Sequence, residues 1–345
     1  MCDKLASLRG KEGAPLANCF QDASMNRRTF LAAATAAVWE GVSRTMKAKT
    51  PSIPIIDTHI HLFDPRRRQG IPWPPKDDPV LYKPALPGRY RQVTEGQGIV
   101  GAIEVECSSW LDDNQWVLDV AATDPMIVGT VGDLEPDKPD FRKQLERFQR
   151  NPLFRGIRYG NLWGRNLSAE LSNRGFVAGL KEVASAGLEF DTANPDVALI
   201  AAVLRITDEV PDLRIVIDHL PQYNPPTESR ARREYEANLR ELGKRPQVFV
   251  KMSEVLRRVA GRVSLDVDFY RPRLDELWEI FGEDRLMYGS DWPNSDQIET
   301  LPQELTLVRS YLAGKGTAAA EKVFWKNSIA AYRWIKRDAS QPTLG

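Results

Sequence analysis

The segment IPIIDTHIH, residues 53–61, contains the first of eight short apolar runs that decide the fold of this chain. The runs are rich in β-branched residues, and longer segments with apolar residues at helical spacing separate them. They occupy residues 53–57, 98–106, 126–134, 154–159, 188–191, 213–218, 248–252 and 286–290. Such alternation is typical of βα repeats around a parallel sheet.

The helices expected between these runs lie near residues 114–123, 140–150, 168–186, 195–210, 227–242 and 268–281, with two more after Leu301. Eight strands with interleaved helices predict an α/β protein with a single-domain (β/α)8 TIM-like barrel over residues 51–345 and C-terminal helices. A doubly wound open sheet is the alternative. It would need a glycine-rich phosphate loop after an early strand, and no such loop follows the first runs.

The composition of the chain argues against two classes of binding partner, nucleic acid and anionic membranes. The 345 residues include 47 Lys+Arg and 47 Asp+Glu, so the formal net charge is zero. Such a chain exerts no general attraction on nucleic acid or on an anionic membrane, and we expect neither as a partner. The three cysteines, Cys2, Cys19 and Cys107, make no disulfide framework, and we expect Cys107 to be a small buried residue.

Residues 1–50 are interpreted as a leader. Residues 25–39, MNRRTFLAAATAAVW, resemble a twin-arginine export signal, with Arg27 and Arg28 before a weakly apolar stretch too short to span a bilayer. This predicts a periplasmic or exported protein that meets the twin-arginine export machinery, has no membrane anchor and starts at Met25. The alternative is an alanine-rich N-terminal helix in a cytoplasmic protein.

A proline-rich segment follows the first run. Residues 63–90, FDPRRRQGIPWPPKDDPVLYKPALPGRY, are too long for a routine βα connection, and the prolines around Trp73 make the segment stiff. We expect it to form a lid or wall over the mouth of the barrel. The alternative is an exposed polyproline ligand for a signalling module.

The chain has three histidines, all at the ends of predicted strands. His59 and His61 are one residue apart, so the period-2 geometry of a strand directs both imidazoles to the same side. Two imidazoles on one face have the spacing to hold a divalent cation, although a pair of half-buried surface histidines has the same spacing.

Two further polar residues end later strands. His219 ends the sixth run, directly after Asp218, and Asp291 ends the eighth. Both would lie with the histidine pair on the C-terminal face of the barrel, where TIM-barrel enzymes carry out chemistry. Each also has a purely structural interpretation, as a core histidine bonded to a carbonyl group and as a helix cap.

Five motifs occur in order along the chain: IIDTHIHLFDP (55–65), FRGIRYG (154–160), RIVIDHLP (214–221), FVKMSE (249–254) and LMYGSDWP (286–293). Together they resemble the amidohydrolase superfamily, in its amidohydrolase-related branch of metal-dependent hydrolases. That branch includes sugar-acid lactonases, a pyrone-dicarboxylate lactonase and some decarboxylases. The resemblance implies a TIM barrel and a small-molecule substrate.

The resemblance also implies roles for individual residues. His59 and His61 would contact a metal, most simply zinc, or the substrate carbonyl, and Asp291 would ligate the metal and take the proton of water. His219 would lie beside the substrate, and Arg158 would meet a substrate carboxylate or hydroxyl; a guanidinium suits that task, although a structural ion pair is the alternative. Aromatic side chains expected at the substrate are Tyr159, Trp73 and Trp292.

The chain also departs from the pattern. Members with a filled metal site carry a histidine or carboxylated lysine after strand four or five, where this chain has Tyr159 and Asp191. The site is therefore either mononuclear with carboxylate help or binds metal weakly or not at all. Glu106 is expected as an additional ligand or a polar wall residue, since a buried glutamate needs a partner; an ion pair with Lys251 is the alternative.

The expected activity is opening of a lactone of a sugar acid, or of a related carboxylated small molecule, by activated water. Two alternatives use the same residues. One is non-oxidative decarboxylation of an aromatic or enol acid, and the other is a periplasmic sugar-acid binding protein that performs no reaction. The sequence leaves the substrate and the formation of an oligomer open.

Overall fold

The computed structural model describes residues 53–221 and 225–344. The predicted leader and its export signal therefore lie outside the described residues. Among the described residues, no helix combines the length and the apolar character that crossing a membrane requires.

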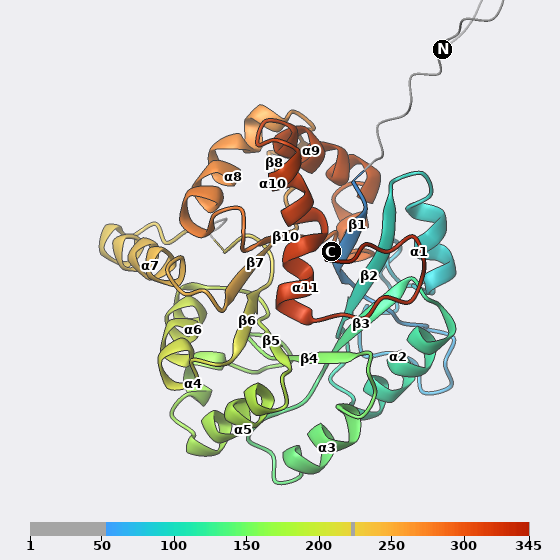
Figure 1. Cartoon of the computed structure of the whole chain (residues 1–345), viewed down its shortest axis with the longest axis vertical. Helices are drawn as coiled ribbons and strands as arrows, with labels where there is room; N and C mark the ends of the chain where they lie inside the picture. The colour runs from blue at the N-terminus through green and yellow to red at the C-terminus, as the bar shows by residue number, and fades with distance from the viewer. Residues whose placement is uncertain (1–52, 222–224, 345) are drawn as a thin grey trace, which may run out of the picture. The chain divides into compact units, whose positions relative to one another are not determined.

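Eight parallel strands form one sheet in chain order, as the eight apolar runs predicted. The strands are β1 (Ile55–Ile60), β2 (Ile99–Val105), β3 (Ile127–Gly132), β4 (Phe154–Arg158), β5 (Glu189–Asp191), β6 (Arg214–Ile217), β7 (Val248–Met252) and β10 (Leu286–Tyr288). A parallel bridge between Ile60 and Trp292 joins the first strand to the segment after the last. The sheet is thus a (β/α)8 TIM barrel, as Figure 1 shows, and the open-sheet alternative is wrong.

The helices surround the barrel (Figure 1). They are α1 (Pro87–Val93), α2 (Leu111–Thr123), α3 (Phe141–Phe148), α4 (Leu167–Glu170), α5 (Arg174–Ser185), α6 (Val197–Glu209), α7 (Ser229–Leu242), α8 (Val267–Phe281), α9 (Leu301–Ala313), α10 (Thr317–Glu321) and α11 (Asn327–Tyr332). Short helical turns span Asn294–Gln297 and Lys322–Lys326.

Two predicted helix boundaries were wrong. The expected helix over residues 168–186 is divided into α4 and α5, because Asn166 and Asn173 each cap a new N-terminus by accepting a backbone N–H. Likewise, α6 starts after Asp196, whose side chain accepts from the Leu199 N–H, so Pro195 lies before the helix. Side-chain capping outweighed helical periodicity at both places.

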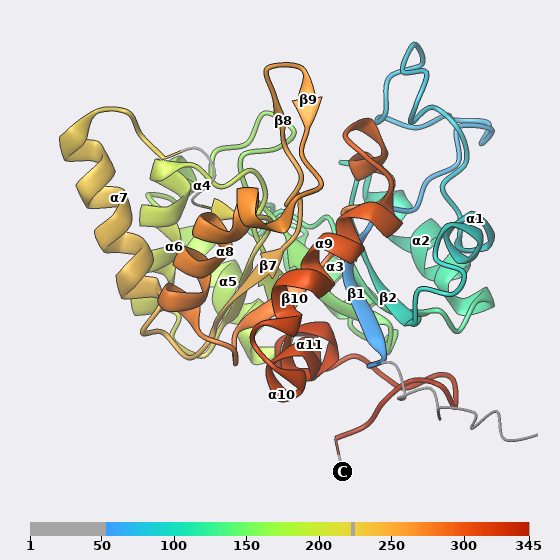
Figure 2. The same cartoon turned by 90° about the horizontal axis from the view of Figure 1, so that it is seen from above.

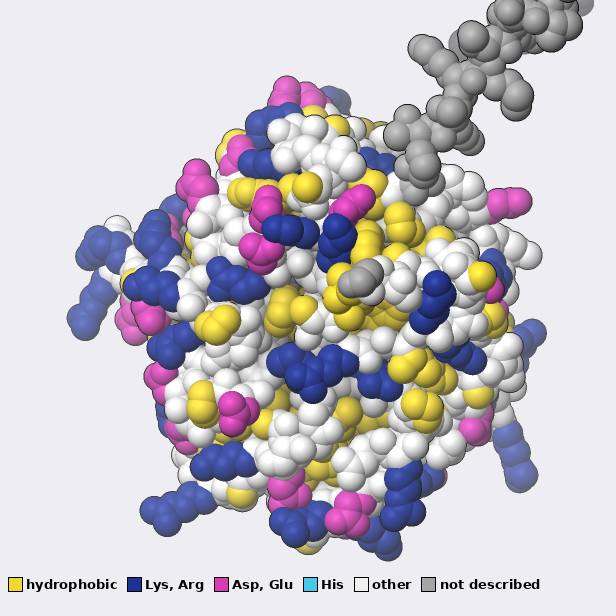
Figure 3. Space-filling view, in the orientation of Figure 1, with side chains coloured by type: hydrophobic (Ala, Val, Ile, Leu, Met, Phe, Trp, Pro, Cys, Tyr) yellow, Lys and Arg dark blue, Asp and Glu magenta, His cyan; other side chains and the backbone are white. Residues whose placement is uncertain are grey.

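The two ends of the barrel differ. Helix α11 lies across the end where the strands begin (Figure 2). The hydroxyl of Tyr332 in this helix donates to Asp191 Oδ1 at 2.9 Å. The face that includes this end carries Lys and Arg side chains interspersed with Asp and Glu, and no histidine is visible on it (Figure 3). A two-stranded hairpin, β8 (Arg258–Val259) and β9 (Arg262–Val263), extends from the opposite end. Among the described residues, α11 covers one end of the barrel, so the opposite end is the candidate mouth of a site.

The structure locates two sequence segments, the proline-rich residues 63–90 and the glycine-containing residues 96–101. Residues 63–90 lead from β1 into the first turn of α1 and run along the mouth side, and Trp73 packs against Phe63. Closure of this segment as a lid stays a prediction. The stretch GQGIVG, residues 96–101, has the GxGxxG spacing of dinucleotide sites. It leads from α1 into β2, so it does not form the strand-to-helix turn that binds a pyrophosphate.

Candidate active site

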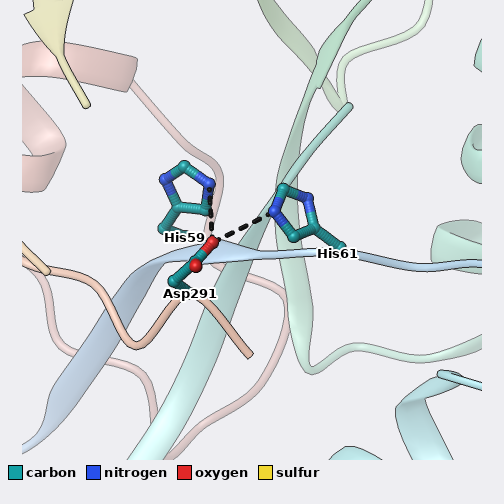
Figure 4. A group of neighbouring side chains, drawn as sticks. All are labelled: His59, His61 and Asp291. Carbon is teal, nitrogen blue, oxygen red and sulfur yellow. Dashed lines mark hydrogen bonds and ion pairs between the residues drawn. The ribbon is translucent and has the colours of Figure 1, made fainter. Parts of the chain in front are cut away.

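Three side chains converge at the mouth of the barrel (Figure 4). The Nε2 atoms of His59 and His61 lie 3.4 Å and 3.1 Å from the same carboxylate oxygen, Oδ1 of Asp291. All three residues are buried. They come from opposite ends of the chain, and they meet because β1 and the segment after β10 are neighbours in the closed barrel.

Local backbone pairing fixes this arrangement. The Asp291 N–H donates to the His59 carbonyl, and the His61 N–H donates to the Trp292 carbonyl, both at 2.8 Å. The strands approach so closely that a Cβ at Gly289 would lie 2.9 Å from the His59 Cβ. Only glycine fits there, so the position of His59 requires glycine at residue 289.

The ring nitrogens fit a divalent metal ion. Nδ1 of His61 lies 2.7 Å from the Val105 carbonyl oxygen, which only accepts, so Nδ1 carries the hydrogen and Nε2 of the neutral ring presents a lone pair. Nε2 of His59 has no hydrogen-bond partner although it is buried. Two imidazole nitrogens facing one carboxylate oxygen form the donor set that zinc prefers.

The surroundings of His59 keep its ring neutral. Burial and the nearby charge of Lys251 hold the pKa of His59 well below its usual range, against the opposite effect of Asp218. A metal ligand must be an unprotonated imidazole, so this environment favours metal binding.

A buried charge network lies behind His59. The Lys251 ammonium is 2.6 Å from Asp191 Oδ2 and 2.7 Å from Asp218 Oδ1, and 3.2 Å from Nδ1 of His59. All of these groups are fully buried. The alternative of an ion pair between Lys251 and Glu106 is therefore wrong: the partners of Lys251 are Asp191 on β5 and Asp218 after β6.

Asp291 is held as a carboxylate. Burial acts to raise its pKa, but the His61 ring, 3.1 Å away through Nε2, and the nearby His219 and His59 rings act in the opposite direction and hold the pKa below its usual range. Its other oxygen accepts from Nδ2 of Asn294 at 2.7 Å. The group is thus oriented and ready to ligate a metal or to accept a proton.

A cavity opens over this group. Its lining residues are His61, Trp73, Cys107, Arg158, Leu162, Trp163, Asn194, His219, Glu254, Asp291 and Asn294. Seven described non-glycine residues have a positive φ, and five of them line this cavity: Trp163, Asn194, His219, Glu254 and Asp291. Backbone strain of this kind gathers at functional sites.

The predicted catalytic residues His219 and Arg158 both lie in this lining. Nδ1 of His219 is 3.0 Å from the Ser253 hydroxyl. The Arg158 guanidinium pairs with Asp218 at 2.8 Å through Nε and donates from Nη1 to the Glu106 carbonyl at 3.1 Å. Arg158 therefore has a structural ion pair and also faces the cavity.

Of the three aromatic residues predicted to contact the substrate, one lines the cavity and two do not. Trp73 lines the cavity and meets the His61 ring edge-on. Trp292 is completely buried against Tyr90, and Tyr159 is buried against Phe176; neither belongs to the lining. The structure therefore does not bring Trp292 or Tyr159 to the cavity, because their side chains point into the helical layer.

Glu106 lies beside the cavity, apart from the histidine pair. Its carboxylate accepts from the Ser108 N–H and from Nε1 of Trp163, and it lies 3.9 Å from Arg158. It is not among the groups of described residues whose ligand atoms converge. The structure thus places Glu106 as a polar wall residue, one of the two predicted roles.

The raised pKa of the buried Glu106 carboxyl group predicts that the free energy of unfolding depends on pH. Burial raises its pKa to about 7, more than the charge of Arg158 lowers it. The unfolded glutamate loses its proton near pH 4.5, so the stability of the wild type falls as pH rises from about 4.5 through about 7, by on the order of 3 kcal/mol from this group. Glu106→Gln removes this contribution.

Denaturant titrations of Glu106→Gln and the wild type across pH 4–8 measure the difference. The variant should gain stability relative to the wild type through that window, whereas Glu95→Gln, at an exposed glutamate, should run parallel to the wild type. A constant difference for Glu106→Gln would show that folding does not shift the pKa of Glu106.

Sequence reasoning missed several cavity residues. Asn194, Asn294 and Glu254 were not singled out. Glu254 ends the motif FVKMSE, directly after β7, so its place at a strand end was the available signal. The helix α1 and the β8–β9 hairpin were also not predicted.

The comparisons with known proteins agree with this geometry. The family model described as amidohydrolase matches residues 56–334. An L-fucono-1,5-lactonase of Burkholderia ambifaria is 26% identical over 245 residues, covering 70% of this chain and 80% of that protein. A second L-fucono-1,5-lactonase, of Burkholderia multivorans, is 24% identical over 293 residues and covers 80% and 94%.

Among solved structures, an amidohydrolase from Burkholderia multivorans with bound zinc superimposes with a TM-score of 0.71. It is 21% identical and covers 82% of this chain and 100% of that one. The likeness supports the barrel, and the family model spans nearly all of it. The chain belongs to the amidohydrolase family.

Proposed function

We propose that this protein is a lactonase: it hydrolyses the cyclic ester of a sugar acid with the help of a divalent metal ion, most simply zinc. The observation that carries the proposal is the approach of the two Nε2 atoms of His59 and His61 to one oxygen of Asp291 beneath an open cavity. The L-fucono-1,5-lactonases among its relatives support the substrate class.

His59, His61 and Asp291 would hold the metal. A divalent ion in such a site lowers the pKa of water towards ~7 and so makes hydroxide available at neutral pH. This matters here because a carboxylate with a low pKa is a weak base and needs an acidic water as its partner.

The residues of the chain then perform the proton transfers. Asp291 accepts a proton from water as the water oxygen bonds to the lactone carbonyl carbon. His219 donates a hydrogen bond to the carbonyl oxygen, which becomes negative in the addition step. The ring C–O bond breaks, and the ring oxygen takes the proton back from Asp291. The product is the open hydroxy acid.

A proton-release assay tests the proposal. Purified protein is mixed with a panel of aldono-1,5-lactones and a pH indicator, before and after chelation and after addition of Zn²⁺. We expect turnover that chelation abolishes and Zn²⁺ restores. Release of carbon dioxide from aromatic acids instead would favour the decarboxylase alternative, and ligand binding without turnover would favour the binding protein.

A further inference from the structure

We propose that Glu254 is a specificity residue that accepts hydrogen bonds from hydroxyl groups on the substrate ring, so that the site prefers a neutral polyhydroxylated lactone. This inference rests on the lactonase proposal. It assigns to Glu254 the selection of the substituents on the lactone ring. It starts from the position of Glu254 directly after β7, at the end of FVKMSE.

The side chain of Glu254 faces the reacting centre. A carboxylate oxygen of Glu254, a ring nitrogen of His219 and a carboxylate oxygen of Asp291 all lie within 4.8 Å of one another. About one third of the Glu254 side chain is exposed, and the residue lines the cavity. It can therefore contact a ligand whose carbonyl group lies near His219 and Asp291.

The backbone of Glu254 is in an unfavourable conformation. Its φ is +50°, in the left-handed region that favours glycine and, among other residues, asparagine and aspartate. Glutamate has no local hydrogen-bonding advantage there, in contrast to Asn194, which has a similar φ of +52°. A strained glutamate pointing into a cavity indicates that its carboxylate has a task.

The charges of the cavity suggest which ligand groups suit that task. Arg158 is the one arginine or lysine among the lining residues, and Asp218 already neutralises it at 2.8 Å. The lining itself contributes two carboxylates, Glu254 and Asp291. A carboxylate on the substrate ring would be repelled by Glu254, whereas hydroxyl groups are donors that a carboxylate accepts strongly.

The alternative use of Glu254 is as a ligand of a second metal ion with His219 and Asp291. The position of Glu254 argues against this role. One of its oxygens, Oε2, lies 3.8 Å from the guanidinium of Arg257, a cation that competes with a metal ion for the same carboxylate. Metal content is therefore one of the measurements in the test.

The test compares binding and turnover for two rings. The ligands for calorimetry are a polyhydroxylated δ-lactam and unsubstituted δ-valerolactam, and the substrates are the matching δ-lactones. In Glu254→Gln we expect the Kd of the hydroxylated lactam to rise and kcat/KM of the hydroxylated lactone to fall, each by about 10- to 100-fold. Values for the unsubstituted rings should change less than about twofold.

A second variant separates strain from recognition. Glu254→Gly should lose the same discrimination while its Tm rises by about 1–4 °C, because glycine suits the backbone. Arg333→Gly is the matched control: Arg333 is exposed, has a φ of +52° and ends α11 at the closed end of the barrel. It should show the rise in Tm with unchanged kinetics.

Each result decides the proposal. Equal losses for hydroxylated and unsubstituted rings, wild-type protein that binds neither lactam, or a lower metal content per chain in Glu254→Gln would each overturn it. Wild-type protein that binds the hydroxylated lactam selectively but opens no lactone would overturn the lactonase proposal and leave this inference standing.

Discussion

Asp291→Asn is expected to lower kcat/KM for lactone hydrolysis by about a thousandfold. The amide has the shape of the carboxylate but cannot take the proton of water, and loss of a positioned general base costs 10²–10⁴-fold. The substitution also removes the negative charge that Nε2 of His59 and of His61 face at 3.4 Å and 3.1 Å. Initial rates and the zinc content of the purified variant are measured together.

The zinc content divides the two roles of Asp291. Loss of activity with zinc retained assigns proton transfer, and loss of both assigns ligation. Asp296→Asn is the matched control, because Asp296 lies five residues further on, pairs with Arg89 at 3.0 Å and is not part of the cavity lining. More than a tenth of wild-type activity in Asp291→Asn would contradict the mechanism.

The strands of this fold were predictable because each is a short apolar run between segments of different period. The run that contains β7, for example, is Val248–Met252 both in the sequence and in the structure. Helix boundaries were less predictable, since they depend on single capping side chains such as Asn173. The β8–β9 hairpin has two residues a strand and no apolar pattern, so periodicity gives no signal for it.

The centre of the site was predictable for a different reason. His59 lies in the last residues of β1, and His61, His219 and Asp291 come after β1, β6 and β10. The ends of parallel strands meet on one rim of the barrel. The direction of a side chain beyond the end of a strand follows no such rule. Trp292 directly follows Asp291 yet points into the helical layer, so adjacency to a catalytic residue did not place it in the cavity.

The partners of the buried charged side chains could not be predicted from the sequence either. Glu106 was expected to need a partner, and Lys251 was the alternative for it, but period-2 alternation does not say which strands supply the partners of a buried charge. In the barrel, Asp191 from β5 and Asp218 after β6 lie 2.6 Å and 2.7 Å from the Lys251 ammonium, whereas the cation beside Glu106 is Arg158, at 3.9 Å. Partner choice is a property of the closed barrel, in which β5, β6 and β7 are neighbours.

Lys251→Met is expected to lower the free energy of unfolding by about 3–5 kcal/mol, because removal of one partner leaves buried charges uncompensated. Burial acts to raise the pKa of Asp218, yet Lys251, His59 and Arg158 together hold it well below its usual range. Without the ammonium, Asp191 and Asp218 face each other across the vacated space. Urea titration near neutral pH measures the loss.

The double variant Lys251→Met with Asp191→Asn tests whether charge, and not lost packing, causes that change. Removing the Asp191 carboxylate leaves Asp218, which keeps its 2.8 Å ion pair with Arg158, and the amide introduced at position 191 can still accept from the Tyr332 hydroxyl. The double variant should therefore be more stable than Lys251→Met alone. In the wild type, in contrast, Asp191→Asn removes a partner of Lys251 and should be destabilising.

Asp191→Asn would thus raise the free energy of unfolding in one background and lower it in the other, and such a change of sign shows that residues 191 and 251 interact. Additive losses would mean that Lys251 contributes through the packing of its methylene groups, and that the carboxylates behind His59 are compensated by other groups.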